Sequence, residues 1–125
     1  MVTMSDEIPA APAGSSEAAT RLWNSVMEAY ELEQHELVLL VQACRTVSTL
    51  DALDAEVQRD GAVVATAGGG KKASPAAIES RQQSVALARI IAALRLPAGA
   101  AGDQQLGARP QRRSAPRGVY GLVKP

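Results

Sequence analysis

The chain has 125 residues, of which 46% are hydrophobic, but it contains no Phe, one Trp and two Tyr. Ala supplies much of this apolar fraction, and because Ala buries little surface, a core made by one copy would be thin. This favours self-association or a partner. The single cysteine, Cys44, excludes an internal disulfide and a cysteine-rich zinc site and favours a reducing compartment. Residues 1–60 carry three arginines against eleven acidic residues (net −8), and residues 61–125 carry ten basic residues against two acidic ones (net +8), so we expect a polyanionic partner or acidic-to-basic contacts between copies.

Residues 1–16 consist mainly of Ala, Pro, Ser and Gly with two acidic residues, and they are predicted to be disordered. They also lack a basic start followed by an apolar run, so no signal peptide is expected. A first helix is predicted from Ser16 or Glu17 to about Tyr30. We interpret Trp23 as a packing anchor of this helix, with contact to a protein or a nucleic-acid base as the alternative.

After an acidic joint, Glu31 to Glu36, a second helix is predicted from about Glu36 to Asp60, before Gly61. A helix of that length would be roughly 35–40 Å long. His35 is interpreted as a solvated residue at the helix start, because there is no HExxH motif and no nearby Cys to complete a ligand set. The acidic residues of the last turns favour a solvated face over a carboxylate site; they are Asp51, Asp54 and Glu56. The longest strongly apolar run, Leu37 to Val41, is too short to span a bilayer, so no membrane contact is expected.

The connector from Ala62 to Ala73 holds a short β-prone piece and then a glycine run before Lys71 and Lys72. It does not form a phosphate-binding loop of the GxxxxGK[ST] type, because Ala65 stands where Gly is needed and Lys72 where Ser or Thr would bind magnesium. We predict a turn or irregular hairpin. Contact between the two lysines and a phosphate backbone is a secondary hypothesis.

A third helix is predicted from Ser74 to Leu96, because both of its ends carry termination signals. Ser74 suits the N-cap and Pro75 the first helical position, while Pro97 stops the run. Apolar residues at three- and four-residue spacings predict one stripe along the helix: Ile78, Val85, Leu87, Ile90, Ile91 and Leu94. Three arginines fall largely outside that stripe: Arg81, Arg89 and Arg95.

Residues 98–125 are rich in Gly, Pro, Gln and Arg and are predicted to form a flexible basic tail. Its basic cluster consists of Arg109, Arg112, Arg113 and Arg117. A small apolar cluster follows and is a candidate docking peptide: Val119, Tyr120 and Leu122. An unstructured end without a partner is the alternative. The predicted organisation is therefore residues 1–16 disordered, 17–97 a helical oligomerisation core and 98–125 a tail.

Three parts of the chain resemble the small terminase subunits of tailed bacteriophages, particularly those of actinobacterial phages. The first is Cys44-Arg45-Thr46-Val47 continuing through Leu50-Asp51-Ala52-Leu53, followed by a Gly-containing connector. The second runs from Ser74-Pro75-Ala76 through Arg81-Gln82-Gln83 to Ile90-Ile91-Ala92-Ala93-Leu94-Arg95-Leu96-Pro97. The third is the arginine-rich end with Arg117-Gly118-Val119-Tyr120-Gly121.

The predicted elements give a mainly α fold, a long helical hairpin with a short N-terminal helix and a small irregular or β-hairpin connector. The resemblance implies a protein without enzymatic activity that assembles as a homo-oligomeric ring in the cytoplasm of the infected bacterial host. Such a ring would bind viral double-stranded DNA and recruit and regulate the large terminase subunit, an ATPase and nuclease. Candidate DNA-binding residues are Lys71, Lys72, Arg81, Arg89, Arg95, Arg109, Arg112, Arg113 and Arg117. Candidate oligomer-interface residues are Trp23, Leu40, Val47, Leu50, Ile78, Val85, Ile90 and Leu94.

The alternative function is a homo-oligomeric helical adaptor whose basic half pairs with an acidic protein or with its own acidic half. An enzyme is disfavoured, because no nucleophile–base pair, metal-ligand spacing or nucleotide loop is present in the sequence. No cofactor or metal is expected. A helix-turn-helix is not supported, since the first two helices lack the usual short Gly-containing turn.

Overall fold

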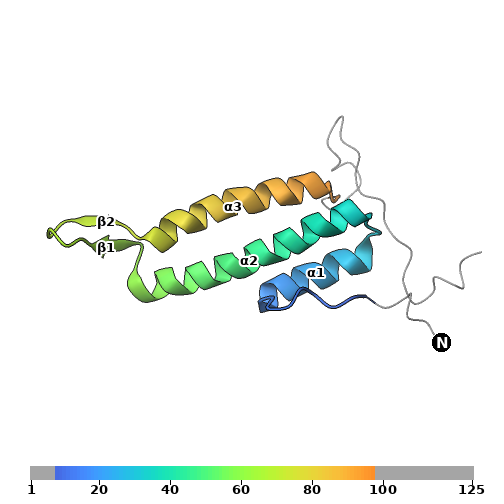
Figure 1. Ribbon diagram of the computed structural model, residues 1–125, viewed down its shortest axis with the longest axis horizontal. Helices are drawn as coiled ribbons and strands as arrows, with labels where there is room; N and C mark the ends of the chain where they lie inside the picture. The colour runs from blue at the N-terminus through green and yellow to red at the C-terminus, as the bar shows by residue number, and fades with distance from the viewer. Residues whose placement is uncertain (1–7, 98–125) are drawn as a thin grey trace, which may run out of the picture.

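The structure is a computed structural model that describes residues 8–97 and contains three helices and a β-hairpin in that range (Figure 1). In chain order the elements are α1 (Glu17–Ala29), α2 (Gln34–Asp60), β1 (Val63–Ala65), β2 (Lys71–Ala73) and α3 (Pro75–Leu94). The helices lie side by side with α2 in the middle, and the β-hairpin projects beyond the C-terminal end of α2 and the N-terminal end of α3 (Figure 1). The predicted mainly helical fold with a small connector is confirmed.

Helix α1 begins where its cap chemistry predicts. The Ser16 hydroxyl oxygen accepts a hydrogen bond from the backbone N–H of Ala19 at 3.2 Å, which satisfies one of the free amides of the first turn. The helix buries one face, formed by Ala19, Trp23, Val26 and Met27, against α2. Because α1 has 13 residues and α2 has 27, α1 covers only the first part of α2 (Figure 1).

Helix α2 begins two residues earlier than the predicted start at Glu36, because two glutamates form a capping box. The Glu36 carboxylate accepts a hydrogen bond from the backbone N–H of Glu33 at 2.7 Å and is itself buried. Glutamate is not a common N-cap residue, so the sequence pattern did not reveal this start. The helix ends at Gly61, whose φ of +89° favours glycine.

The connector is a regular two-stranded antiparallel hairpin with Val63 opposite Ala73, Val64 opposite Lys72 and Ala65 opposite Lys71. At its tip, the backbone N–H of Thr66 donates to the Gly70 carbonyl at 2.9 Å, and the N–H of Gly70 donates to the Thr66 hydroxyl at 3.1 Å. Of the two predicted forms, the hairpin is therefore the one adopted. It holds both lysines on β2.

Helix α3 follows its predicted boundaries closely. The Ser74 hydroxyl oxygen accepts hydrogen bonds from the N–H groups of Ala76 and Ala77 at 3.1 and 3.3 Å. At the other end Arg95 adopts a left-handed conformation with φ of 52°, which closes the helix by a hydrogen bond from its N–H to the Ala92 carbonyl at 3.0 Å. The helix runs antiparallel along α2 (Figure 1).

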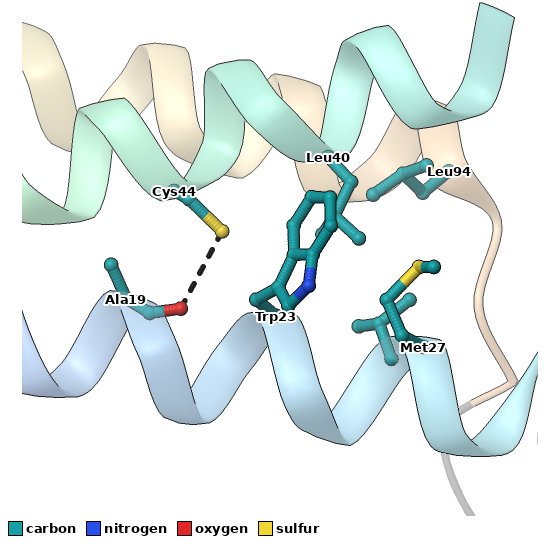
Figure 2. Close-up of a cluster of buried hydrophobic side chains, with 7 residues drawn as sticks. Ala19, Trp23, Met27, Leu40, Cys44 and Leu94 are labelled. Atoms are coloured by element: carbon teal, nitrogen blue, oxygen red, sulfur yellow. Dashed lines mark hydrogen bonds between the residues drawn. The ribbon is translucent and has the colours of Figure 1, made fainter. Parts of the chain in front are cut away.

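The fully buried apolar residues of the described range gather at one end of the molecule, where α1, the first half of α2 and the end of α3 meet (Figure 2). Leu40 of α2 and Leu94 of α3 are both completely buried, and Trp23 lies between α1 and α2. Cys44 donates a weak hydrogen bond from its thiol to the Ala19 carbonyl at 3.5 Å, and burial raises the pKa of this thiol. The core is small, as the composition predicts.

Residues 8–16 differ from the predicted disorder. The Trp23 indole N–H donates to the Pro9 carbonyl at 2.7 Å, and Ile8 and Ala11 pack against the core. A buried indole needs an acceptor for its N–H, and this segment supplies one. The prediction of disorder is therefore wrong for residues 8–16, and its remaining part, residues 1–7, lies outside the described range.

Candidate nucleic-acid interface

Lys71 and Lys72 stand on opposite faces of the β-hairpin. Successive residues of a strand point to opposite faces, so Lys71 lies with Ala65 on one face and Lys72 lies with Val64 on the other. Both lysines are exposed. The hairpin projects at the end of the molecule away from the buried core, so nothing in the described range shields either charge (Figure 1).

Helix α3 presents its predicted arginines to solvent. Arg81 and Arg89 are exposed on the side of α3 that faces away from α2, and Arg95 is exposed at the C-cap. The inward side of the same helix carries half-buried residues and the buried Leu94. The described basic residues therefore run from the hairpin tip along the outer side of α3.

These five basic residues form no ion pair with a carboxylate in residues 8–97, whereas two of the three arginines of the acidic half are paired with carboxylates. The third, Arg45, donates a hydrogen bond to the Gln42 side chain at 3.1 Å. Arg21 lies 3.4 Å from Glu17, and Arg59 lies 3.5 Å from Glu56 and 3.2 Å from Asp60. The hydrogen bond to Asp60 raises the pKa of Arg59. Glu79, the one acidic residue of range 61–97, instead accepts a hydrogen bond from Gln83 at 2.8 Å.

Charge is consequently segregated in the described structure. Residues 8–60 carry three arginines against nine acidic residues, a net charge of −6, and residues 61–97 carry five basic residues against Glu79, a net charge of +4. The first group forms α1 and α2, and the second forms the hairpin and α3. The outer side of α3 and the hairpin thus make one basic surface, and α1 with α2 makes an acidic one.

The structure places the predicted oligomer-interface residues in three different environments. Trp23, Leu40 and Leu94 are buried in the core of one copy, so their side chains stabilise the protomer and are not available to a second copy without unfolding it. Val47, Leu50 and Ile90 are half-buried. Only Ile78 and Val85 are open, with 39% and 48% of their surface exposed. The single predicted stripe of α3 is thus divided between an inward and an outward face.

The remaining polar candidates occupy solvated positions. His35 is exposed in the first turn of α2, and Asp51, Asp54 and Glu56 are exposed in its second half, in agreement with the predicted solvated face. Within residues 8–97 no group of three or more His, Cys, Asp or Glu side chains is arranged to hold a metal ion. No helix in that range combines the length and hydropathy needed to cross a bilayer.

The predicted sites beyond Pro97 lie outside the described residues. They are the basic cluster Arg109, Arg112, Arg113 and Arg117 and the candidate docking peptide Val119, Tyr120 and Leu122. Sequence reasoning overlooked one feature of the described range, the absence of a described ion-pair partner for Asp51 and Asp54. Their neighbours Glu56 and Asp60 form ion pairs with Arg59, and only the structure shows which carboxylates are paired.

Comparison of the chain with protein-family models, with curated proteins and with solved structures found no match in any of the three. A function must therefore be inferred from the charge distribution and shape of the chain itself.

Proposed function

We propose that this chain is a phage small terminase subunit, which binds viral double-stranded DNA as a homo-oligomer and recruits and regulates the large terminase subunit without catalysing a reaction itself. The observation that carries this proposal is the exposed basic surface of the hairpin and α3, which lacks carboxylate partners in residues 8–97. A surface of this kind attracts a polyanion.

The shape of the hairpin supports a DNA partner over a small anion. The major groove of B-DNA is about 12 Å wide and admits a two-stranded β-ribbon. Because Lys71 and Lys72 lie on opposite faces of such a ribbon, each can contact a different sugar–phosphate wall of the groove. Two lysines supply no base readout, so this contact would be independent of DNA sequence.

Oligomerisation would compensate for the weakness of each individual contact. Once one copy of an assembly is bound, the other copies bind at a high effective concentration, so repeated weak phosphate contacts add up to a stable complex. The small core and the exposed apolar residues Ile78 and Val85 support an assembly of several copies.

The salt dependence of DNA binding tests this function. The affinity of the full chain for a duplex, measured by fluorescence anisotropy over a range of salt concentrations, should fall linearly on log–log axes with a slope of roughly −0.9 per phosphate neutralised. Replacing Lys71 and Lys72 by Ala should reduce the slope by up to about 1.8 for each copy in contact with DNA. Replacing Arg109, Arg112, Arg113 and Arg117 by Ala should reduce it further.

Arg21→Ala is the matched control, because Arg21 is exposed on α1 and already paired with Glu17. It should leave the slope unchanged. An unchanged slope after substitution of the four tail arginines would remove the tail from the DNA interface. Oligomeric protein without any salt-sensitive DNA affinity would contradict the proposal and favour the adaptor.

A further inference from the structure

The outward face of α3 carries an apolar seam flanked by arginines. Ile78, Val85 and Ala92 are spaced by seven residues, the repeat of a helix that packs lengthwise on another helix. Ile78 and Val85 are the large exposed apolar residues of this helix. At 100° per residue, Arg81 and Arg89 fall about 40° to either side of Val85. We call these five residues the α3 seam.

A second unpartnered face lies on α2, beyond the N-terminal end of α1. The stripe that α1 covers includes Cys44, Val47 and Ser48, and the Ser48 hydroxyl accepts a hydrogen bond at 2.9 Å from the backbone N–H of Ser16, just before α1 begins. Residues seven positions further along α2 lie on the same face of the helix, beyond the start of α1. Four of them are exposed: Asp51, Asp54, Ala55 and Gln58. We call these four residues the acidic ledge.

The two faces complement each other in charge. Asp51 and Asp54 have no ion-pair partner within residues 8–97, and Arg59, the arginine of this half of α2, is paired with Glu56 and Asp60. Arg81 and Arg89 also lack a described partner. Small residues, Ala55 on the ledge and Ala92 on the seam, leave room for two helices to approach closely. An arginine–aspartate contact between copies would neutralise both faces.

Within one chain the two faces cannot meet. The seam points away from α2, and the ledge lies on the side of α2 along which α1 runs, whereas α3 runs along the other side (Figure 1). We propose that the α3 seam of one copy binds the acidic ledge of a second copy, an inference that rests on the homo-oligomer of the proposed function. Such a contact joins two different surfaces, so it repeats head to tail and closes into a ring when the rotation permits.

This contact gives Arg81 and Arg89 a role that differs from the DNA contact predicted for them. They bind the neighbouring copy, and phosphate contact then depends on Lys71, Lys72 and the tail. The distinction has a measurable signature. Loss of a DNA contact at Arg81 and Arg89 cannot be restored by changing Asp51 and Asp54, whereas loss of a copy-to-copy contact can.

Charge reversal tests the contact in the full chain, with mass measured by light scattering. Wild type should have a mass of at least twice the 13.0 kDa chain mass. Arg81→Glu with Arg89→Glu should yield single chains, and so should Asp51→Arg with Asp54→Arg. An equimolar mixture of these two variants should reassemble, because each supplies the charge that the other has lost. Glu17→Arg with Arg21→Glu, a reversal on the exposed face of α1, is the matched control and should keep the wild-type mass.

A single-chain mass for wild type, a wild-type mass for either reversed variant, or a mixture that stays dissociated would overturn this interface. Far-UV circular dichroism checks that the variants are folded, and the milder pair Arg81→Gln with Arg89→Gln should still reduce the mass if the reversed pair is unfolded. DNA affinity measured on the same samples separates the two proposals. If the reversed variants keep the wild-type mass while wild type shows salt-sensitive DNA binding, only this interface is contradicted. If the mixed variants reassemble but wild type does not bind DNA, only the proposed function is contradicted.

Discussion

At the scale of single residues, Trp23 shows why residues 8–16 are ordered in the structure although their composition predicts disorder. Segment 8–16 has too little apolar surface to order itself, but the Trp23 indole N–H is buried and takes the Pro9 carbonyl as its acceptor. The two groups are fourteen residues apart in sequence. A pattern of local composition cannot reveal such a contact, because the acceptor is an ordinary backbone group.

Trp23→Phe should release this segment, since Phe keeps an aromatic ring but has no N–H to donate. The loss of one hydrogen bond and of part of the ring volume should lower the free energy of unfolding by about 1–3 kcal/mol. Hydrogen exchange should show faster exchange in residues 8–16 than in wild type. Asn24→Ala, at the adjacent exposed position of α1, is the control, and a segment that stays protected in the Phe variant would contradict the role of the hydrogen bond.

Cys44 makes stability depend on alkaline pH. Burial raises the pKa of its thiol, so the folded chain keeps a proton that the unfolded chain releases above about pH 8.5. The stabilisation is therefore complete below that pH and is lost as the pH rises toward the folded pKa. Urea unfolding at pH 7.5, 8.5 and 9.5 should show a decrease approaching about 1.4 kcal/mol per pH unit beyond that of Cys44→Ala. If the free energy of unfolding of wild type and of Cys44→Ala depended on pH in the same way, the Cys44 thiol would not be the cause.

At the scale of elements, the predicted helix ends are accurate where capping chemistry is ordinary. Ser16 and Ser74 mark the starts of α1 and α3, and Gly61 marks the end of α2. The start of α2 was missed by two residues, because Glu33 occupies the N-cap through a reciprocal arrangement with Glu36. Capping that depends on two side chains acting together is harder to recognise than a single serine.

Ser74→Ala should destabilise α3 specifically. The Ser74 hydroxyl satisfies two backbone amides and is buried, so its removal should cost about 1 kcal/mol. Ser84→Ala replaces an exposed serine in the middle of the same helix and should change stability by a few tenths of a kcal/mol in the opposite direction, because Ala favours helix interiors. Thermal unfolding of both variants checks the difference, and equal melting temperatures would exclude a capping role.

The division of α3 into two faces was not predictable from spacing alone. Its apolar residues follow helical periodicity, but Ile78 and Val85 point outward while Leu87, Ile90 and Ile91 are half-buried. Alanine occupies positions on every side of the helix, so the contrast between faces is weak. Only the packing of α2 against α3 decides which of these apolar residues remain exposed.

At the scale of the whole molecule, the sequence predicted the segregation of charge but not its arrangement in space. The counts of basic and acidic residues in each half follow directly from composition. That α1 and α2 together form the acidic surface, and that two aspartates on it lack a described partner, depend on how the helices lie together. The candidate basic residues of the hairpin and α3 are exposed, as predicted, and their proposed division between DNA and a second copy rests on the fold.

The difference in length between α1 and α2 has a mechanical consequence. Every fully buried apolar side chain in residues 8–97 lies in the three-helix end, so most of the folding free energy is concentrated there. The remainder of α2 and α3 is a two-helix arm, held by half-buried contacts, with the lysine-bearing hairpin at its extremity. Such an arm can bend or fray while its base stays intact, and its tip can therefore follow the curvature of a partner at little cost in stability.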